Sequence, residues 1–279
     1  MILAGKDVAS AMKRQAKTVI ESNLQRLGRA PKLAIIMVGE DNAASQAYVR
    51  NKLKACDETG IINETIILPQ NCTQADILSK IKELNQDKTT DGILVQLPLP
   101  AHINVAEVQE AIRPDKDVDG FGKEHMGACW LNVPGIRPCT PAGIMALLHY
   151  YDIPLAGKNC LIIGRSNIVA KPLAAMLLSE DATVTIAHSK TKNLFTLSQT
   201  MDLIVVSVGK PEFLPPTAVK DGVILIDVGI NRNEQGKLVG DVNHSCYDKA
   251  TAYTPVPGGV GLLTVAQLIC NCVQAWLTH

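Results

Sequence analysis

A tyrosine and a lysine, Tyr48 and Lys52, stand four residues apart and are preceded by Ser45. On an α-helix these three side chains share one face. An aromatic hydroxyl beside an amine can stack on a flat substrate and hold or move a proton. The same spacing is also typical of a solvated helix with a half-buried tyrosine and a lysine stem lying along apolar surface. The rest of the chain must decide between a chemical site and an ordinary surface helix.

The composition indicates an α/β protein. The chain has 279 residues, of which 47% are hydrophobic and only 4% aromatic, so its apolar content is mostly Ala, Val, Ile and Leu. That mixture is typical of buried parallel strands, and the length allows one large or two medium domains. Basic and acidic residues number 27 each, so the net charge of zero gives no indication of nucleic acid or an acidic membrane as a partner.

The N-terminal sequence, the lengths of the apolar runs and the cysteines favour a cytoplasmic protein. The N-terminus lacks the basic-then-apolar order of a signal peptide, and no apolar run is expected to span a membrane. The eight cysteines are scattered without a C-x-x-C pair, so we expect reduced thiols that mainly serve packing. The six histidines show no ligand spacing, and no metal site is expected.

Helix and strand signals alternate along the first half of the chain. Short apolar runs predict strands, and apolar residues at helical spacing predict the helices between them. Thr73, with Asp76 three residues on, predicts a helix start. The predicted strands cover 32–38, 65–68 and 92–96, and the predicted helices 8–27, 45–59, 73–85 and 104–112.

The second half repeats the alternation after a segment of different texture. Residues 113–139 are rich in glycine and proline and predict an interdomain segment. Thr140 and Pro141 then predict a helix start, with the threonine as cap. The predicted strands that follow are 159–163, 183–187, 203–208 and 223–228, before a nearly all-apolar and therefore buried helix at 263–277.

This order predicts an α/β fold of two lobes with a cleft between them. We expect an N-terminal β-α-β catalytic domain at 1–118 and a Rossmann-like, doubly wound NADP-binding domain at 140–260. The C-terminal helix, 263–279, is expected to pack back across the lobes.

The segment 164–170 follows a buried strand and precedes a helix, where doubly wound folds bind a dinucleotide pyrophosphate. Only Gly164 of the usual glycine pattern is present, so a plain turn fits this loop equally well. The next strand ends in His188, Ser189 and Lys190, without the acid typical of NAD sites. Together with Arg165, these groups favour a 2′-phosphate and therefore NADP over NAD.

Seven stretches together resemble the bifunctional methylenetetrahydrofolate dehydrogenase/methenyltetrahydrofolate cyclohydrolase family. They extend from one end of the chain to the other in the family's order: 45–52, 91–100, 115–120, 139–141, 164–169, 239–242 and 255–261. The resemblance implies that NADP takes a hydride from 5,10-methylenetetrahydrofolate and that water then converts the methenyl product to 10-formyltetrahydrofolate. It also implies a homodimer in one-carbon metabolism, serving purine, methionine and histidine biosynthesis.

The resemblance gives Tyr48, Lys52, Gln96 and Asp119 specific roles. It implies that Lys52 is the catalytic base, which must be neutral at some stage, with Gln96 as a neutral partner that positions it. Tyr48 would stack on the folate rings as a catalytic and binding residue. Asp119 would accept hydrogen bonds from the two donors at one edge of the pterin, whereas its neighbours Asp115 and Asp117 are interpreted as solvated or structural.

The resemblance also assigns binding roles to glycines and to the second domain. Gly258 and Gly259 would form a wall of the folate pocket, since glycine permits close backbone approach. The residues implied to touch NADP are Gly164, Arg165, Ser166, Ser189 and Ile230.

The sequence departs from the family pattern at three places. Ala170 stands where the family usually has glycine, Leu262-Leu263 replaces Pro-Met, and Asn42-Ala43 replaces a proline. None of these departures removes a proposed catalytic group, so we expect changed affinity rather than changed identity.

Two alternatives remain open from the sequence. A monofunctional NAD(P)-dependent dehydrogenase is the nearest, although short-chain dehydrogenases place their Y-x-x-x-K pair after the nucleotide loop, and here Tyr48 and Lys52 precede Gly164. A non-catalytic folate- or nucleotide-binding protein is the other, but a binding protein has no need of Lys52 as a base.

Overall fold

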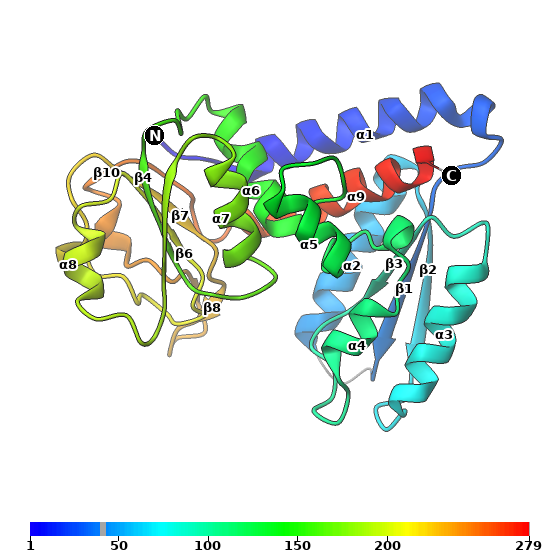
Figure 1. The fold of residues 1–279 in the computed structure, drawn as a ribbon. Coiled ribbons are helices and arrows are strands. Elements are labelled where there is room, and N and C mark those ends of the chain that lie inside the picture. The colour runs from blue at the N-terminus through cyan, green and yellow to red at the C-terminus, as the bar shows by residue number, and fades with distance from the viewer. Residues whose placement is uncertain (40–42, 279) are drawn as a thin grey trace. The chain divides into compact units, whose positions relative to one another are not determined.

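The computed structural model describes residues 1–39 and 43–278 and contains two compact α/β units (Figure 1). The three-stranded unit comprises Ser10–Ala128, Pro134–Cys139 and Val265–His279. The five-stranded unit comprises Met1–Ala9, Cys129–Val133 and Thr140–Thr264. The fold is therefore α/β with two parallel sheets, as the alternation of helix and strand signals predicts.

The three-stranded unit is built on a parallel sheet with the order β2-β1-β3. Its strands are β1 (Lys32–Val38), β2 (Ile62–Leu68) and β3 (Gly92–Val95). Parallel neighbours require crossover connections. These are provided by α2 (Ala43–Thr59) between β1 and β2 and by α3 (Gln74–Gln86) between β2 and β3.

Side chains of the central strand alternate between the two faces of this sheet. Leu33, Ile35 and Met37 belong to one buried cluster, with residues of α1 (Gly5–Leu27), α2 and α9 (Val260–Thr278). Ala34 and Ile36 belong to the other, with residues of α3 and α4 (Val105–Glu110). Both faces are covered by helices, which explains why the strand reads as an unbroken apolar run.

The start of α3 follows the predicted capping box. The Thr73 hydroxyl accepts from the backbone N–H of Asp76 at 3.2 Å, and the Asp76 carboxylate accepts from the backbone N–H of Thr73 at 2.8 Å. Both backbone donors would otherwise lack partners at the end of a helix. The predicted helix is confirmed within one residue at each end.

The closing helix α9, red in Figure 1, is long and apolar enough to cross a membrane, contrary to our expectation that no segment reaches this length. Its apolar side chains lie in the protein core instead. Leu268, Ile269, Cys272 and Trp276 are each at most 1% exposed and belong to the core of the three-stranded unit. The helix therefore has the burial of a core helix.

The five-stranded unit has the parallel strand order β10-β7-β6-β4-β5. The strands are β4 (Asn159–Ile163), β5 (Thr183–Ala187), β6 (Leu203–Val206), β7 (Val223–Asp227) and β10 (Ala250–Tyr253). The unit also contains a two-stranded ribbon, β8 (Asn231–Arg232) and β9 (Leu238–Val239), and the helices α6 (Cys139–Tyr150), α7 (Ala170–Leu178) and α8 (Leu194–Ser198).

The order of strands in the five-stranded sheet contains a reversal. The chain passes from β4 to β5 on one side and then returns to β6 on the other. This reversal is the topological switch point at which doubly wound sheets bind ligands.

The segment 113–139 contains a short 3-10 helix at Pro114–Lys116 and the helix α5 (Lys123–Trp130). One local prediction is wrong. Thr140 does not cap α6, which begins one residue earlier; its hydroxyl lies 2.9 Å from the Thr264 hydroxyl instead. A partner more than a hundred residues away overrides the local capping preference.

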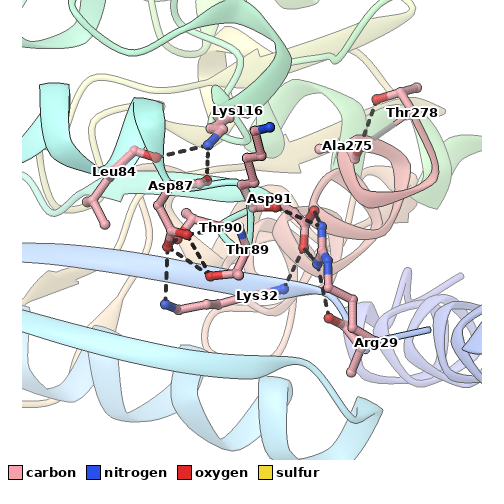
Figure 2. A network of polar contacts seen from close by, with 12 residues as sticks. Arg29, Lys32, Leu84, Asp87, Thr89, Thr90, Asp91, Lys116, Ala275 and Thr278 are labelled. Atoms are coloured by element: carbon pink, nitrogen blue, oxygen red, sulfur yellow. Dashed lines mark hydrogen bonds and ion pairs between the residues drawn. The ribbon is translucent and has the colours of Figure 1, made fainter. Parts of the chain in front are cut away.

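A polar network lies where β1 and β3 begin (Figure 2). The Arg29 guanidinium donates to both oxygens of the Asp91 carboxylate, at 2.6 and 2.7 Å, and the backbone N–H of Lys32 donates to it at 2.8 Å. The Lys116 ammonium donates to the backbone carbonyls of Leu84 and Asp87 at 2.9 and 2.6 Å. These bonds connect loops at the end of the sheet where β1 and β3 begin. The candidate catalytic pair lies at the opposite end, where β3 ends and Gln96 accepts from Lys52.

Candidate functional site

Lys52 and Gln96 meet at the carboxyl end of the three-stranded sheet. The Lys52 ammonium donates to the Gln96 side-chain oxygen at 2.9 Å. The Gln96 amide nitrogen donates in turn to the Leu97 carbonyl at 2.6 Å. The second bond fixes the orientation of the amide, so its oxygen must face the lysine. Gln96 is therefore a neutral acceptor that orients Lys52 without the charge of a carboxylate.

The helix face predicted from the sequence is present in α2. Lys52 is 9% exposed, whereas Tyr48, one turn earlier, is 41% exposed. A buried amine beside an exposed aromatic ring matches an amine that acts on a substrate and a ring that stacks on it. Ser45 lies on the same helix, but its side chain lies outside the described residues.

Asp119 lies in the electrostatic field of Lys52. Burial raises the pKa of the Asp119 carboxyl to about 6; the Lys52 charge opposes this shift, and the nearby Asp117 carboxylate adds to it. The Cys139 thiol is a weak donor 3.9 Å from the same carboxylate. The structure therefore brings Asp119 toward the Lys52–Gln96 pair, and among the described residues its carboxylate retains capacity to accept further hydrogen bonds.

The neighbouring aspartates are occupied by structural contacts, as the sequence interpretation holds. The buried Asp117 carboxylate accepts from the backbone N–H groups of Gly120 and Gly122, at 3.0 and 2.7 Å. Asp115 pairs with Arg113 at 2.6 Å near the surface. Asp117 thus shapes the loop that carries Asp119.

Asn271 also holds this loop, although it lies outside the motifs of the sequence. Its side-chain amide, 1% exposed within α9, donates to the carbonyls of Val118 and Arg137 at 2.8 and 2.9 Å. Val118 directly precedes Asp119, so α9 fixes the backbone next to the candidate binding carboxylate. The available signal was an asparagine on the buried face of a mostly apolar helix.

A small cavity adjoins Gln96. It encloses about 130 Å³ and is lined by residues at the end of β1 and after β3, together with Gln70. The lining residues are Met37, Val38, Gly39, Gln70, Gln96, Pro98, Leu99 and Pro100. The position agrees with the rule that open α/β sheets bind ligands outside the carboxyl ends of their strands.

The five-stranded unit has a larger pocket, of about 450 Å³, at its switch point. Three of the predicted cofactor residues, Gly164, Arg165 and Ser189, line it. The lining includes the cationic side chains of Arg165 and Lys210 and the ring of His188, and among the described residues it includes no carboxylate. This set of donors fits a phosphate-bearing dinucleotide, and it favours an extra phosphate on the ribose. Lys210 lies outside any motif, so its place in the pocket follows only from the structure.

The backbone at Gly164 requires glycine. Its φ is +141°, and a Cβ at this position would lie 2.6 Å from the Ser207 carbonyl oxygen. The next predicted contact, Ser166, uses its hydroxyl to accept from the backbone N–H groups of Val169 and Ala170 at 3.2 and 3.3 Å. Ser166 therefore helps to shape the start of α7, and its contact with NADP stays a prediction.

The remaining predicted site residues also belong to the five-stranded unit. Gly258 has a φ of +105°, and its carbonyl accepts from the backbone N–H of Gly5 at 2.9 Å. A Cβ at Gly259 would lie 2.6 Å from the Pro255 carbonyl oxygen. Ile230 is 46% exposed. The backbone thus explains both glycines, while the folate wall and the contact of Ile230 with NADP stay predictions.

The departures from the family pattern fit their surroundings. Ala170 is fully buried at the start of α7. Leu263 is also fully buried and packs closely on Gly143 of α6, whereas Leu262 is 43% exposed. Asn42 lies outside the described residues.

Comparison with known proteins gives consistent matches over the whole chain. Residues 3–119 match the model of the tetrahydrofolate dehydrogenase/cyclohydrolase catalytic domain, and residues 138–279 match that of the NAD(P)-binding domain. The bifunctional protein FolD of Ligilactobacillus salivarius is 52% identical over 91% of this chain and 89% of its own length. That of Campylobacter curvus is 50% identical over 98% of this chain and 95% of its own length.

Solved structures of tetrahydrofolate dehydrogenase/cyclohydrolase enzymes also match this chain over nearly its whole length. The FolD methylenetetrahydrofolate dehydrogenase/cyclohydrolase of Campylobacter jejuni superimposes with a TM-score of 0.97 at 46% identity, covering 100% of this chain and 99% of that one. The Trypanosoma brucei enzyme, solved with NADP cofactor and inhibitor, gives 0.93 at 33% identity, covering 100% and 97%. With both domain models matched in order and close relatives aligned along nearly their full lengths, this chain belongs to the tetrahydrofolate dehydrogenase/cyclohydrolase family.

Proposed function

We propose that the chain oxidises 5,10-methylenetetrahydrofolate with NADP and then hydrolyses the methenyl product to 10-formyltetrahydrofolate. The observation that carries this proposal is the hydrogen bond between Lys52 and Gln96 beside Asp119, in a chain of this family. A non-catalytic binding protein would not need a buried amine held by a neutral acceptor.

The oxidation step requires a nucleotide site. When bound, NADP supplies a hydride acceptor. Arg165 and Ser189 line the pocket and would hold the ribose phosphate, while the glycine at 164 lets the backbone come close.

The hydrolysis step requires a base and its conjugate acid. A neutral Lys52 amine retains one lone pair after donating to Gln96, and it can take a proton from the water that attacks the methenyl carbon. A carbon–oxygen bond forms, and one carbon–nitrogen bond to the pterin then breaks. The Lys52 ammonium can return the proton to that nitrogen, while the second proton of the attacking water leaves to solvent as the formyl group forms.

Binding of the pterin is assigned to Asp119 and Tyr48. The carboxylate can accept from the pterin N3–H and 2-amino group together, as carboxylates do from arginine. The Tyr48 ring, 41% exposed one turn from Lys52, offers a stacking surface.

This assignment predicts a pH dependence. The pKa of Asp119 is raised to about 6, so the carboxyl is largely protonated below that pH and cannot accept from both pterin donors. We expect kcat/KM for the folate substrate to fall as the pH drops through about 6. The profile should be measured from pH 5 to 8 for the wild type and for Asp119→Asn. A wild-type profile without this fall, or a fall of the same size and position in the variant, would contradict the role of Asp119.

The function itself is tested with two separate assays. Methylenetetrahydrofolate is supplied with NADP or with NAD, and methenyl formation and its hydrolysis are followed independently. We expect both reactions, with NADP preferred. Oxidation without hydrolysis would instead favour a monofunctional dehydrogenase, and no oxidation with either nucleotide would reject the enzyme proposal.

We also propose a cytoplasmic homodimer that serves one-carbon metabolism, including purine, methionine and histidine biosynthesis. The edge strand β2 supports an interface, since Ile62 and Ile67 are 53% and 49% exposed on a strand that, within the described residues, has a neighbouring strand on one side only. A solution mass equal to that of a single chain would reject the dimer.

A further inference from the structure

A fully buried carboxylate in the five-stranded unit has no part in the steps described above. Asp241 is 0% exposed and accepts four hydrogen bonds. Three come from the successive backbone N–H groups of Val208, Gly209 and Lys210, at 2.6, 2.9 and 2.9 Å. The fourth comes from the side-chain amide of Asn231, at 2.9 Å. Hydrogen bonds to a buried ionised acceptor are among the strongest in proteins.

The segment that Asp241 holds is part of the nucleotide pocket. Residues 208–210 follow directly from the carboxyl end of β6, and both Val208 and Lys210 line the pocket. Because three consecutive N–H groups converge on one carboxylate, the backbone of this wall is constrained at every residue. Asp241 does not itself line the pocket, so its influence on a bound nucleotide passes through these residues.

A second buried carboxylate holds Asp241 in turn. Asp227, at the end of β7, accepts from the backbone N–H groups of Asp241 and Val242, both at 2.9 Å, and from that of Gly229 at 3.0 Å. A Cβ at Gly240 would overlap the Asp227 carboxylate. Burial raises the pKa of Asp227 to about 6. The family stretch at 239–242 therefore has a structural role, because the Asp227 and Asp241 carboxylates connect three loops by hydrogen bonds.

We propose that Asp241 is a positioning residue for the nicotinamide cofactor, which fixes the 208–210 wall of the pocket and thereby the place of Lys210 beside the nucleotide phosphates. This inference rests on the proposed use of NADP. It concerns affinity for the cofactor rather than the chemical step, because the groups that donate to the Asp241 carboxylate all belong to the five-stranded unit, which carries the nucleotide pocket.

The test is Asp241→Asn, which keeps the size of the side chain. In either orientation of the amide, its NH₂ group replaces an oxygen that accepts two N–H groups, so donors would face donors. We expect the Kd and KM for NADP to rise at least tenfold, while kcat of the oxidation at saturating NADP changes less than threefold. Asp248→Asn, an exposed aspartate of the same unit, is the matched control and should leave both constants unchanged.

A merely structural role would give a different result. The variant would then unfold at a lower temperature yet bind NADP normally while folded, and an unchanged Kd in calorimetry below the unfolding transition would overturn the proposal. If Asp241→Asn does not fold, Asn231→Ala removes one of the four donors and leaves the charge in place. We expect a smaller rise in Kd, of about two- to fivefold, and no rise in this variant would equally reject the inference.

The calorimetric experiment also separates this inference from the proposed function, because it needs no folate. A wild-type protein that does not bind NADP would reject both. Normal binding by the wild type and by both variants would reject only the positioning role of Asp241.

Discussion

Replacing Lys52 with methionine should abolish the hydrolysis of methenyltetrahydrofolate. Methionine keeps an unbranched side chain in the buried position but has no amine, so neither the attacking water nor the leaving nitrogen has a proton partner. Loss of a general acid–base group costs roughly 10²- to 10⁴-fold in rate. The measurement is kcat for methenyl hydrolysis, with the uncatalysed reaction subtracted.

Lys54→Met is the matched control. Lys54 lies two residues further along α2, with its side chain 77% exposed and 3.9 Å from the Glu58 carboxylate. An exposed pair of this kind contributes little. We expect near wild-type hydrolysis from this variant, because its amine is on another face of the helix. Hydrolysis by Lys52→Met at the control's rate would show that Lys52 is not the base.

Replacing Asp91 with alanine should strongly lower the free energy of unfolding. Asp91 is 0% exposed and receives both arms of the Arg29 guanidinium and the backbone N–H of Lys32 (Figure 2). Removing one partner of a buried pair leaves the other uncompensated, at a cost of about 3–5 kcal/mol. Arg29 is 31% exposed and can be partly hydrated, so we expect the lower end of this range. Urea unfolding, followed by circular dichroism, measures the change.

The chain offers a close comparison in Asp115→Ala. Arg113 donates to both Asp115 oxygens, at 3.0 and 2.6 Å, in the same two-armed geometry, but its side chain is 57% exposed and that of Asp115 is 34% exposed. We expect a loss of less than about 1 kcal/mol. Equal losses in the two variants would mean that burial does not determine the strength of the Asp91 pair.

The sequence alone determines the elements that local patterns specify. The apolar run at Lys32–Val38 becomes a buried strand because each of its two faces must be covered. Thr73 and Asp76 start α3 through bonds within four residues. Tyr48 and Lys52 share a helix face because helical geometry requires it. The motifs in order along the chain also identify the family, which the comparisons confirm.

Only the tertiary structure decides what depends on groups distant in sequence. Lys52 finds Gln96 44 residues away, and Asn271 reaches Val118 across 153 residues. Asp117 and Asp119 are the same residue type, yet among the described residues the Asp117 carboxylate accepts from backbone N–H groups and that of Asp119 does not. Local sequence determines backbone preference, whereas the partner of a buried polar group depends on which loops the fold of each unit brings together.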